Sequence, residues 1–327
     1  MTVGTSIDED DVIVRRYIDK DYTDIIEAGY PFDSYLRPNL YNRVKNLSNW
    51  KEIKKIVLKT FLLNQEEIIL VAYSKKDRKA IGVITLRKIT DNLWGIWDIF
   101  VSPLSRGKRI ASLLYQESFK LLKERKIKKV VGMVFSDNVA SIKSIQRNWQ
   151  GFLSTRIFVC EKKSQMNEDK LPNKIGIKKP PDEKKNLFET FRNCVGEQWR
   201  RVLEIDKNNF LYNLLGPAYF EPISENFLTR SMMKNDIFIA EYKGKIGYAI
   251  SRMVRFFPAY HHLHLFVPVS DNFDDVCRGL LIKAFNQSMY NKKGKFDFIY
   301  VGNEKAENRL RKLGFEVRQG VVPYKYL

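Results

Sequence analysis

The sequence is poor in cysteine and histidine, and it contains no long hydrophobic run. Its 327 residues include three cysteines, Cys160, Cys194 and Cys277, which are far apart and form no CxxC pair. An odd number of widely spaced cysteines argues against a disulfide framework and gives no zinc motif. No stretch of about 18 apolar residues is present, so a membrane-spanning helix is not expected.

The first residues, MTVGTSIDEDDVIV, are acidic and lack the basic segment followed by an apolar one that marks a signal peptide. Together with the scarcity of cysteine, this predicts a soluble, cytoplasmic protein without membrane contact. Hydrophobic residues make up 44% of the chain and charged residues 29%. Because these are the proportions of a globular protein, global disorder is excluded.

Positive charge is what the sequence has in excess. Its 57 Lys and Arg outnumber its 38 Asp and Glu, which gives a net charge of +19. Such a chain accommodates an acidic substrate, cofactor or partner, although net charge does not choose among them. The length suits two domains of ordinary size.

The first half shows alternating strand and helix patterns. Short turns join three runs rich in β-branched and aromatic residues, so we expect an antiparallel meander. A strand and a short acidic helix precede it, and a capping box at Asn49 and Glu52 predicts a further helix. The expected elements are a strand at 12–18, a helix at 19–29, a helix from about 50 to 61, and strands at 67–74, 80–89 and 93–101.

A helix–strand–helix–strand series is expected after the meander. Pro103 ends the third strand, and a basic loop leads to a helix over 110–124. A strand at 129–135 follows, and Asp137 or Asn138 caps a second helix that ends near Gly151 and Phe152. Residues 156–160 form the closing strand.

The second half repeats this order. A lysine- and proline-rich segment that includes a short strand near 174–177 is interpreted as a linker. A second meander at 236–267, a helix at 273–290, a strand at 296–301 and a helix at 303–313 follow. The second Gly-Phe pair lies 163 residues after the first. We therefore predict an internal duplication, with domains at 1–162 and 187–327 and a linker at 163–186.

The segment from Trp97 to Ser112, WDIFVSPLSRGKRIAS, has the pattern of an anion site. A strand leads through a short basic turn directly into a helix, whose first N–H groups and dipole attract negative charge. Arg106, Lys108 and Arg109 add full charges, and Gly107 permits a close approach of backbone to ligand. These features suit a pyrophosphate, although a basic turn without a ligand would show the same residues.

Here the sequence resembles the GNAT superfamily of N-acetyltransferases. Its VSPLSRGKRIASLL segment is similar to the family's coenzyme-A-binding motif, which is Gln or Arg, two residues, Gly, one residue, then Gly or Ala, and which spans Arg106 to Ala111 here. The order of elements over residues 11–160 is that of the family's fold. The segment from Asn138 to Phe152 also resembles the family's next helix, which starts at an Asn and ends in Gly-Phe.

The resemblance implies a mixed α/β (α+β) fold of two GNAT-like domains in tandem, and it implies acetyl-CoA as the co-substrate. Strand residues would offer backbone groups to the pantetheine arm, the loop and first helical turn would hold the pyrophosphate, and two polar residues would lie near the cofactor. These residues are Ile99, Phe100 and Val101; Arg106, Gly107, Lys108, Arg109, Ile110, Ala111 and Ser112; and Asn138 and Ser141.

The sequence departs from the family pattern at two positions. Arg109 stands where the family usually has glycine, so it must tolerate that backbone conformation, and its side chain could reach a phosphate. The tyrosine that many members use to protonate the leaving thiolate corresponds to Ile145, with neighbouring Ser144 as the alternative in this register. No tyrosine lies between Asn138 and Phe152.

A thiolate can take its proton from water, so transfer needs mainly a base and proximity. Asp98, beside the predicted thioester-binding strand residues, is the candidate general base, directly or through a water. Its alternative role is a local cap or a pair with a basic side chain. Glu27 on the acidic helix is a second choice for the base.

The second half is expected to lack the anion site. The loop that corresponds to residues 102–109, Pro268 to Asp275, has no glycine and no cation but three aspartates. The tyrosine position there is Leu310. The three histidines His261, His262 and His264 give no third-ligand pattern, so no metal is expected; a substrate-facing role for them stays open.

The sequence thus predicts an enzyme, an acetyl-CoA-dependent N-acetyltransferase that moves an acetyl group directly to a primary amine, with an active first half and a degenerate second half. The acceptor is a protein or small molecule, and an acidic one would suit the charge. A non-catalytic acyl-CoA-binding regulatory module is the alternative. A nucleic-acid-associated protein is less favoured, because lysine-rich stretches such as 119–129 occur without a nucleic-acid motif. Oligomeric state is left open.

Overall fold

The structure is a computed structural model of the whole chain. It describes residues 11–18, 20–29, 67–162, 176–178, 184–204, 237–242, 245–254, 260–266, 279, 296–302, 305–312 and 314–327. The helices expected at about 50–61 and 273–290 lie outside the described residues. The chain forms two compact units: residues 1–132, 143–150 and 325–327 make unit 1, and residues 133–142 and 151–324 make unit 2.

Unit 1 is built on a mixed sheet, and the predicted meander is confirmed. Successive strands pair antiparallel from β1 to β4, and β5 then pairs parallel to β4. A parallel partner requires a crossover, which α4 supplies. The strands are β1 (Val12–Arg16), β2 (Glu67–Ser74), β3 (Lys79–Lys88), β4 (Leu93–Val101) and β5 (Lys129–Gly132).

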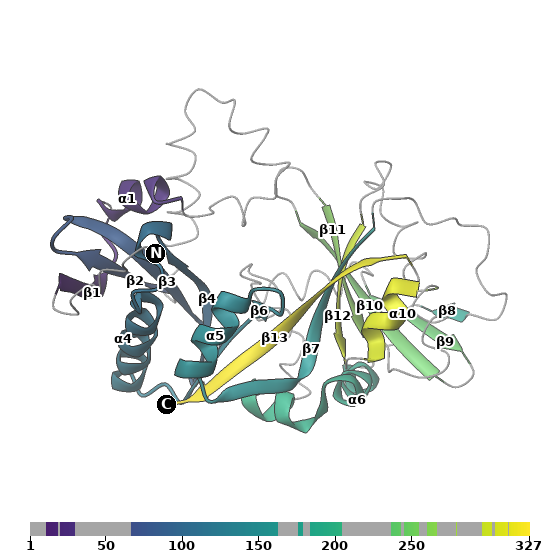
Figure 1. The fold of residues 1–327 in the computed structure, drawn as a ribbon. Helices are drawn as coiled ribbons and strands as arrows, with labels where there is room; N and C mark the ends of the chain where they lie inside the picture. Colours follow the sequence, from purple (N-terminus) through teal and green to yellow (C-terminus); the bar gives the residue numbers. More distant parts are fainter. Residues whose placement is uncertain are drawn as a thin grey trace. The chain divides into compact units, whose positions relative to one another are not determined.

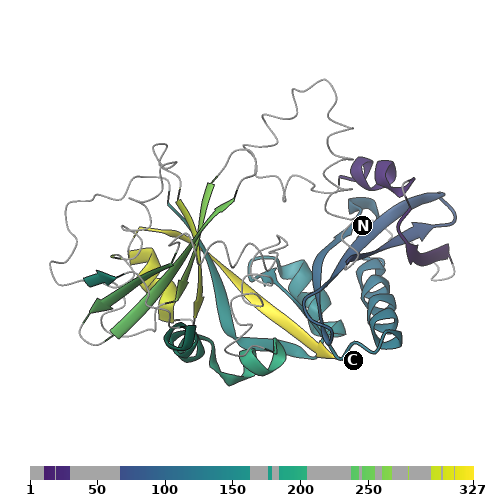
Figure 2. The same ribbon diagram turned by 180° about the vertical axis from the view of Figure 1, so that it is seen from behind.

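Helices α1 (Asp21–Glu27) and α4 (Ile110–Glu124) cover opposite faces of this sheet (Figures 1 and 2). Neighbouring residues of β3 show why, since successive side chains on a strand point to opposite faces. Val83 packs with Ile25 of α1, whereas a Cβ on Gly82 would meet α4.

The first half of α1 is fixed by its acidic residues. Buried Asp21 accepts both terminal nitrogens of Arg15, at 2.6 and 2.7 Å, and the backbone N–H of Ile18. Asp24 accepts the N–H of Ala80 on β3 at 2.9 Å. The first turn of this short helix is therefore tied to the sheet.

Unit 2 holds a further series of paired strands. Its strands pair in the order β6–β13–β7–β12–β11–β10–β9–β8, with β12 parallel to β11 and the remaining pairs antiparallel. The strands are β6 (Val134–Phe135), β7 (Gly151–Lys162), β8 (Gly176–Lys178), β9 (Ile237–Tyr242), β10 (Lys245–Val254), β11 (Tyr260–Phe266), β12 (Phe296–Gly302) and β13 (Glu316–Tyr326).

Three further helices belong to this part of the chain. They are α5 (Val139–Asn148), α6 (Lys184–Val202) and α10 (Lys305–Lys312). The first four residues of α5 belong to unit 2 and the others to unit 1. Helix α6, which the sequence patterns did not predict, packs beside β7 and has a break at Gly196, where φ is +72.

The two halves of the chain pair their strands in the same way. The strands β9, β10 and β11 form an antiparallel meander whose last strand has β12 as a parallel partner. The strands β2, β3, β4 and β5 repeat that arrangement in the first half.

The last strand of each half lies beside a strand of the other half. Strand β7 follows α5 in the chain but pairs with β12, whereas β13 follows α10 but pairs with β6 and β7. The two long strands run side by side in Figure 1, β13 in yellow and β7 in teal. The eleven-residue strand β13 was not predicted from the sequence, and the strand expected at 156–160 is the longer β7.

No helix in the described part of the chain is long and apolar enough to cross a membrane.

Candidate active site

A β-bulge in β4 marks the predicted cofactor strand. Thr85 pairs with Asp98, but the next residue of β3, Leu86, pairs with Ile96, so Trp97 is an extra residue on β4. Such a bulge bends a strand and changes its pairing. The parallel ladder of β4 with β5 ends at Ile96 and Gly132. Beyond the bulge, Asp98 to Val101 stay paired with β3 but are no longer paired with β5.

The loop after β4 is held at its base. The backbone N–H of Ser102 donates to Ile81 of β3 at 2.9 Å, and Ser105 N–H donates to Ser102 O at 2.8 Å. Ser102 and Ser105 are both buried, and residues Pro103–Ser105 form a single 3-10 turn. The start of the loop is therefore rigid, while Arg106, Gly107 and Arg109 are exposed.

The N-terminus of α4 has the backbone features of an anion site. No side chain among the described residues caps this helix, so the N–H groups of its first turn are not taken by a capping residue. Gly107 has a φ of +79, and a Cβ placed on it would meet nothing within 4 Å. The backbone conformation at position 107 thus favours glycine, and there is open space beside this residue.

Arg109 adopts the left-handed conformation at the N-cap position, with φ 59 and ψ 11. This is the conformation that glycine takes easily and that L side chains rarely adopt. The loop therefore keeps a glycine-like backbone at the position where the family usually has glycine.

The cations of the loop lie around this helix end. Arg106, Gly107 and Arg109 are exposed and Lys108 is half-buried. Arg106 donates its Nε to the carbonyl oxygen of Val101 at 3.3 Å, which holds its guanidinium over the end of β4. Charge and helix polarity coincide here, so the residues present suit a pyrophosphate.

Gly82 of β3 allows α4 to pack closely on the sheet. A Cβ at this position would lie 3.1 Å from Ile110 Cγ2, 3.1 Å from the Phe100 carbonyl oxygen and 3.3 Å from Leu114 Cδ1. The absent side chain lets the first turn of α4 rest directly against the β3–β4 pair. The place of the anion site thus depends on one glycine in a strand that the sequence patterns did not single out.

The strand residues of the candidate site divide by face. The side chain of Phe100 is buried in a core cluster with Val83, on the face of α1. Asp98 is half-buried, and since it pairs with Thr85 it lies on the same face of the ladder as Phe100. Ile99 and Val101 are half-buried and point to the α4 face. The candidate base therefore stands on the face opposite α4.

Tyr115 of α4 is a buried phenol in electrostatic range of Asp98. Burial raises the pKa of Tyr115 well above its ordinary value, and the negative charge of Asp98 adds to the rise. The phenol thus stays protonated at neutral pH.

The helix predicted after the strand at 129–135 is α5, and Asn138 immediately precedes its first residue. Asn138 Oδ1 accepts the backbone N–H of Ser141 at 3.1 Å, so Asn138, one of the two candidates, is the capping residue of α5. Ile145, at the tyrosine position of the family, is buried, and neighbouring Ser144 accepts a bond from Asn148 through its backbone oxygen. Glu27, the second-choice base, is an exposed residue at the end of α1.

The structure adds residues that sequence reasoning missed. Asn148 Nδ2 donates to Ser112 Oγ at 3.2 Å, which links the end of α5 to the first turn of α4. Arg318 of β13 forms two hydrogen bonds with Asp137, at 2.9 and 3.1 Å, and its guanidinium carbon lies 3.7 Å from the centre of the Phe135 ring. These contacts join residues that are 36 and 181 positions apart, so no local pattern could have found them.

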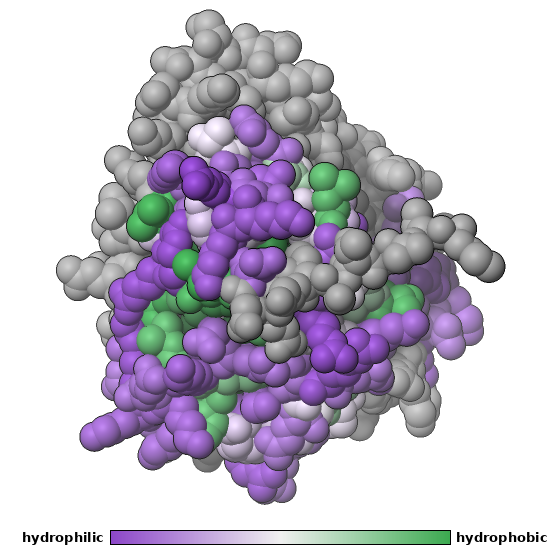
Figure 3. Space-filling model, turned by 60° about the vertical axis from the view of Figure 1, so that its left-hand side comes forward, coloured by the Kyte–Doolittle hydropathy of each residue, from purple (hydrophilic) through white to green (hydrophobic). Residues whose placement is uncertain are grey.

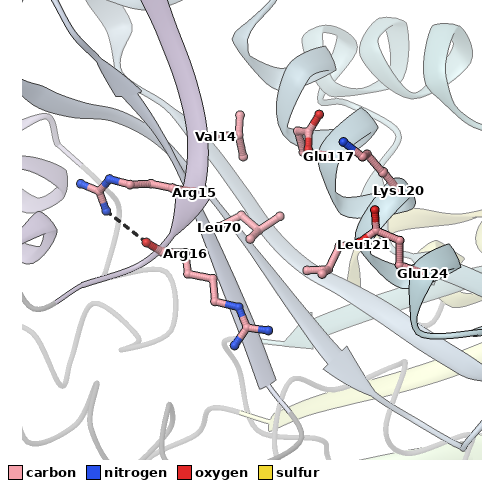
Figure 4. A pocket seen from close by; sticks show the side chains of 8 residues that line it. All are labelled: Val14, Arg15, Arg16, Leu70, Glu117, Lys120, Leu121 and Glu124. Atoms are coloured by element: carbon pink, nitrogen blue, oxygen red, sulfur yellow. Dashed lines mark hydrogen bonds between the residues drawn. The ribbon is translucent and has the colours of Figure 1, made fainter.

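A small pocket in unit 1 lies away from the candidate site. It has a volume of about 220 Å³ and is formed by β1, β2 and the flank of α4. In Figure 4, Glu117, Lys120 and Glu124 lie on the α4 wall across from Val14, Arg16 and Leu70, whereas the side chain of Arg15 points away from α4. Arg15 donates to the Arg16 carbonyl oxygen at 3.0 Å. None of the predicted site residues lines this pocket.

The surface near β1 and α4 has no broad apolar area within the described residues. Figure 3 shows hydrophilic side chains over most of this face, with small hydrophobic patches between them. The large hydrophobic residues exposed in the described part of the chain are single ones: Ile13, Ile18, Leu104, Val139 and Tyr326.

Several expectations for the second half lie outside the described residues. The loop from Pro268 to Asp275 is among them, as are the side chains of the three histidines of β11. Leu310, the tyrosine position of that half, is buried on α10, and Gly314 after it has a φ of +82. In the described ranges no group of three or more His, Cys, Asp or Glu residues could hold a metal ion.

Comparison with known structures shows the fold of the whole chain. The chain is similar to a GCN5-related N-acetyltransferase from Sphaerobacter thermophilus, with 12% identity, a TM-score of 0.58 and coverage of 97% of this chain and 96% of that one. It is also similar to a structure described as a GCN5-related glucosamine N-acetyltransferase region in a fungal multi-domain GH3 β-N-acetylglucosaminidase. That match has 14% identity, a TM-score of 0.55 and coverage of 96% of this chain and 38% of that one.

Comparison with the sequences of curated proteins found no match. The sequence profile described as the acetyltransferase (GNAT) family matches residues 32–152, which include β4, the basic loop, α4 and α5. Residues 32–152 are therefore similar to a GNAT acetyltransferase domain.

Proposed function

We propose that this protein is an acetyl-CoA-dependent N-acetyltransferase that transfers an acetyl group directly to a primary amine. The observation that carries the proposal is the sequence of bulge, anchored loop and uncapped helix from Trp97 to Ser112. It provides strand edges for an extended arm at one end and an anion-binding helix terminus at the other.

In this proposal the loop holds the pyrophosphate. The backbone N–H of Arg106 donates to the Pro103 carbonyl oxygen, so the N–H groups of residues 107–112 and the side chains of Arg106, Lys108 and Arg109 face the phosphates. Ile99, Phe100 and Val101 offer backbone groups to the pantetheine arm. They do so along the edge of β4 that is no longer paired with β5. Asn138 and Ser141 lie at the start of α5, near the cofactor.

Acetyl-CoA, when bound, supplies the thioester whose acetyl group is transferred. The nitrogen of the acceptor forms a bond to the acetyl carbon as the carbon–sulfur bond breaks. Asp98 accepts the proton that the amine loses, directly or through a water, and the thiolate takes its proton from water. Since Ile145 fills the core at the tyrosine position, most of the acceleration comes from proximity and orientation.

We further propose that residues 1–162 and 187–327 descend from one duplicated GNAT-like unit, with a linker at 163–186. The repeated strand pairing in the two halves supports this proposal. The second half is the degenerate copy, because its counterpart of the basic loop carries aspartates. It does not bind acetyl-CoA.

The function is tested by measuring release of free thiol from acetyl-CoA in the presence of a panel of amines and peptides. We expect release that depends on at least one amine class, and a panel with an acidic peptide and a basic peptide tests the preference for an acidic acceptor. Binding of acetyl-CoA without release for any amine would instead support the alternative, an acyl-CoA sensor. Absence of binding would overturn both.

The role of Asp98 is tested with Asp98→Asn, which keeps the shape of the side chain. Loss of a general base lowers kcat by about 100-fold or more, whereas affinity for acetyl-CoA is expected to stay unchanged. Glu27→Gln serves as the matched control and should retain activity. An Asp98→Asn protein with the wild-type pH–rate profile would exclude Asp98 as the base.

A further inference from the structure

Strand β13 contacts the cofactor helix through a short chain of hydrogen bonds. Lys325 Nζ donates to the backbone oxygen of Asn148 at 2.8 Å, and Asn148 Nδ2 donates to Ser112 Oγ at 3.2 Å. Ser112 is the third residue of α4. Residues from three distant parts of the sequence thus form one path that ends in the first turn of the candidate pyrophosphate site.

The same lysine packs on the body of α4. Its Nζ lies 4.7 Å from the centre of the Phe119 ring, within the range of a cation–π contact. Phe119 and Tyr115 of α4 both pack edge-on against Trp149, with ring centres 5.6 and 5.8 Å apart. All three rings are buried. Lys325 therefore contacts both α4, which follows the basic loop, and the last residue of α5.

The backbone around Lys325 is held without its side chain. The N–H of Leu327 donates to Lys128 O at 2.9 Å, and the N–H of Tyr326 donates to Gln150 Oε1 at 3.2 Å. A change of the Lys325 side chain should therefore leave the end of β13 in place. Variants of Lys325 therefore measure what its side chain contributes to cofactor binding, separately from the position of the strand.

We propose that Lys325 and Asn148 are positioning residues that hold Ser112 and the first turn of α4 in the orientation that receives the cofactor. The inference rests on the proposed function. Because Ser112 Oγ accepts the Asn148 bond, its own hydrogen is kept for a second acceptor, such as a phosphate oxygen. Both positioning residues act on cofactor binding and not on the acceptor.

The test is calorimetric titration of acetyl-CoA into the full-length protein and its variants. Lys325→Met keeps the alkyl chain but loses the donor and the charge, and Lys325→Arg keeps both. We expect Lys325→Met to raise the Kd by about five-fold, the order of one lost hydrogen bond, and Lys325→Arg to restore it. Lys312→Met, an exposed lysine of α10, controls for the lost charge and should bind like wild type.

Asn148→Leu supplies an independent arm and closes a double-mutant cycle. It should weaken binding by a similar factor, and adding Lys325→Met should cause little further loss because both changes interrupt one path. Thermal unfolding of each variant distinguishes this coupling from general destabilisation. If Lys325→Met fails to fold, Asn148→Leu alone still decides.

Three results would overturn the proposal. Wild-type Kd values in both Lys325→Met and Asn148→Leu would refute the positioning role and leave the proposed function intact. Fully additive losses in the double variant would show that the two residues act separately. Absence of acetyl-CoA binding by the wild-type protein would refute both the positioning role and the proposed function.

Discussion

At the scale of single residues, the candidate site depends on backbone conformations that the side chains do not favour. Arg109 combines a left-handed φ of 59 with a full positive charge at the start of α4. Holding a side chain in that region costs about 1 kcal/mol or more. The site therefore accepts a local cost in exchange for a cation beside the helix terminus.

This cost predicts a difference between two variants at position 109. Arg109→Gly should have a free energy of unfolding about 1 kcal/mol higher than Arg109→Ala, because only glycine relieves the left-handed conformation. Both variants lose the cation and should bind acetyl-CoA less tightly than wild type. Urea denaturation measures the first effect and calorimetry the second. Equal stability of the two variants would show that the conformation carries no cost.

The pair of Arg318 and Asp137 makes a prediction about pH. The hydrogen bonds and charge of Arg318 hold the pKa of Asp137 below its ordinary value. A lowered pKa in the folded state stabilises the fold above the unfolded pKa of about 3.9, and this contribution is lost as the pH falls through the lowered value. Both groups are exposed, so the effect on stability is small.

We expect Arg318→Met to bring the pKa of Asp137 back toward its ordinary value, as followed by carboxyl-carbon NMR through an acid titration. Arg311→Met is a matched control, since Arg311 pairs with Glu307 on α10. An unchanged pKa of Asp137 in Arg318→Met would contradict the assignment of the shift to this pair.

At the scale of elements, the position of α4 decides where the anion site lies. The helix rests on β3 where Gly82 has no side chain, and its first turn is bonded to Asn148 at the end of α5. A shift of this helix would move the whole first turn and its N–H groups. Packing of a helix on a strand is thus part of cofactor recognition.

Gly82 allows a direct test of this packing. Gly82→Val should lower the free energy of unfolding by about 1–3 kcal/mol, because its side chain would overlap α4 and a backbone oxygen that cannot move aside. It should also weaken binding of acetyl-CoA. Gly151→Ala is the control, because a Cβ there lies 3.5 Å from the Tyr324 ring, an ordinary contact. Chemical denaturation compares the two, and a fully stable Gly82→Val would contradict the close contact.

At the scale of the whole chain, the helices and strands that local sequence patterns encode could be predicted. Helix α4 begins and ends at the predicted residues, and the strands of the first meander differ from the prediction by at most one residue. Strand β13 was missed because its order comes from pairing with β6 and β7, more than 150 residues earlier in the chain. Its Gly320 and Pro323 also weaken a local strand signal.

The candidate site follows the same division. The basic loop and its helix were predictable because a motif, a turn and a helix start coincide within 16 residues. The contacts that position them, from Gly82, Asn148 and Lys325, depend on tertiary packing. Asn148 and Lys325 carry no sequence signature, since an Asn near a helix end and a Lys in a strand are common.

Strand exchange makes the two halves of the chain depend on each other. A fragment of residues 1–162 has β6 and β7 but lacks β13, which pairs with both. We expect this fragment to lack cooperative unfolding and to bind no acetyl-CoA, and we expect a synthetic peptide of residues 316–327 to restore part of the binding. Circular dichroism and calorimetry test this. A fragment that folds and binds alone would contradict it.

The most direct test of the account is amide hydrogen exchange of the full-length protein with and without acetyl-CoA. The N–H groups of residues 107–112, at the uncapped start of α4, should become protected when acetyl-CoA is added, because they donate to its pyrophosphate. Protection elsewhere in the chain with unchanged exchange at residues 107–112, or no protection at any site, would contradict the account.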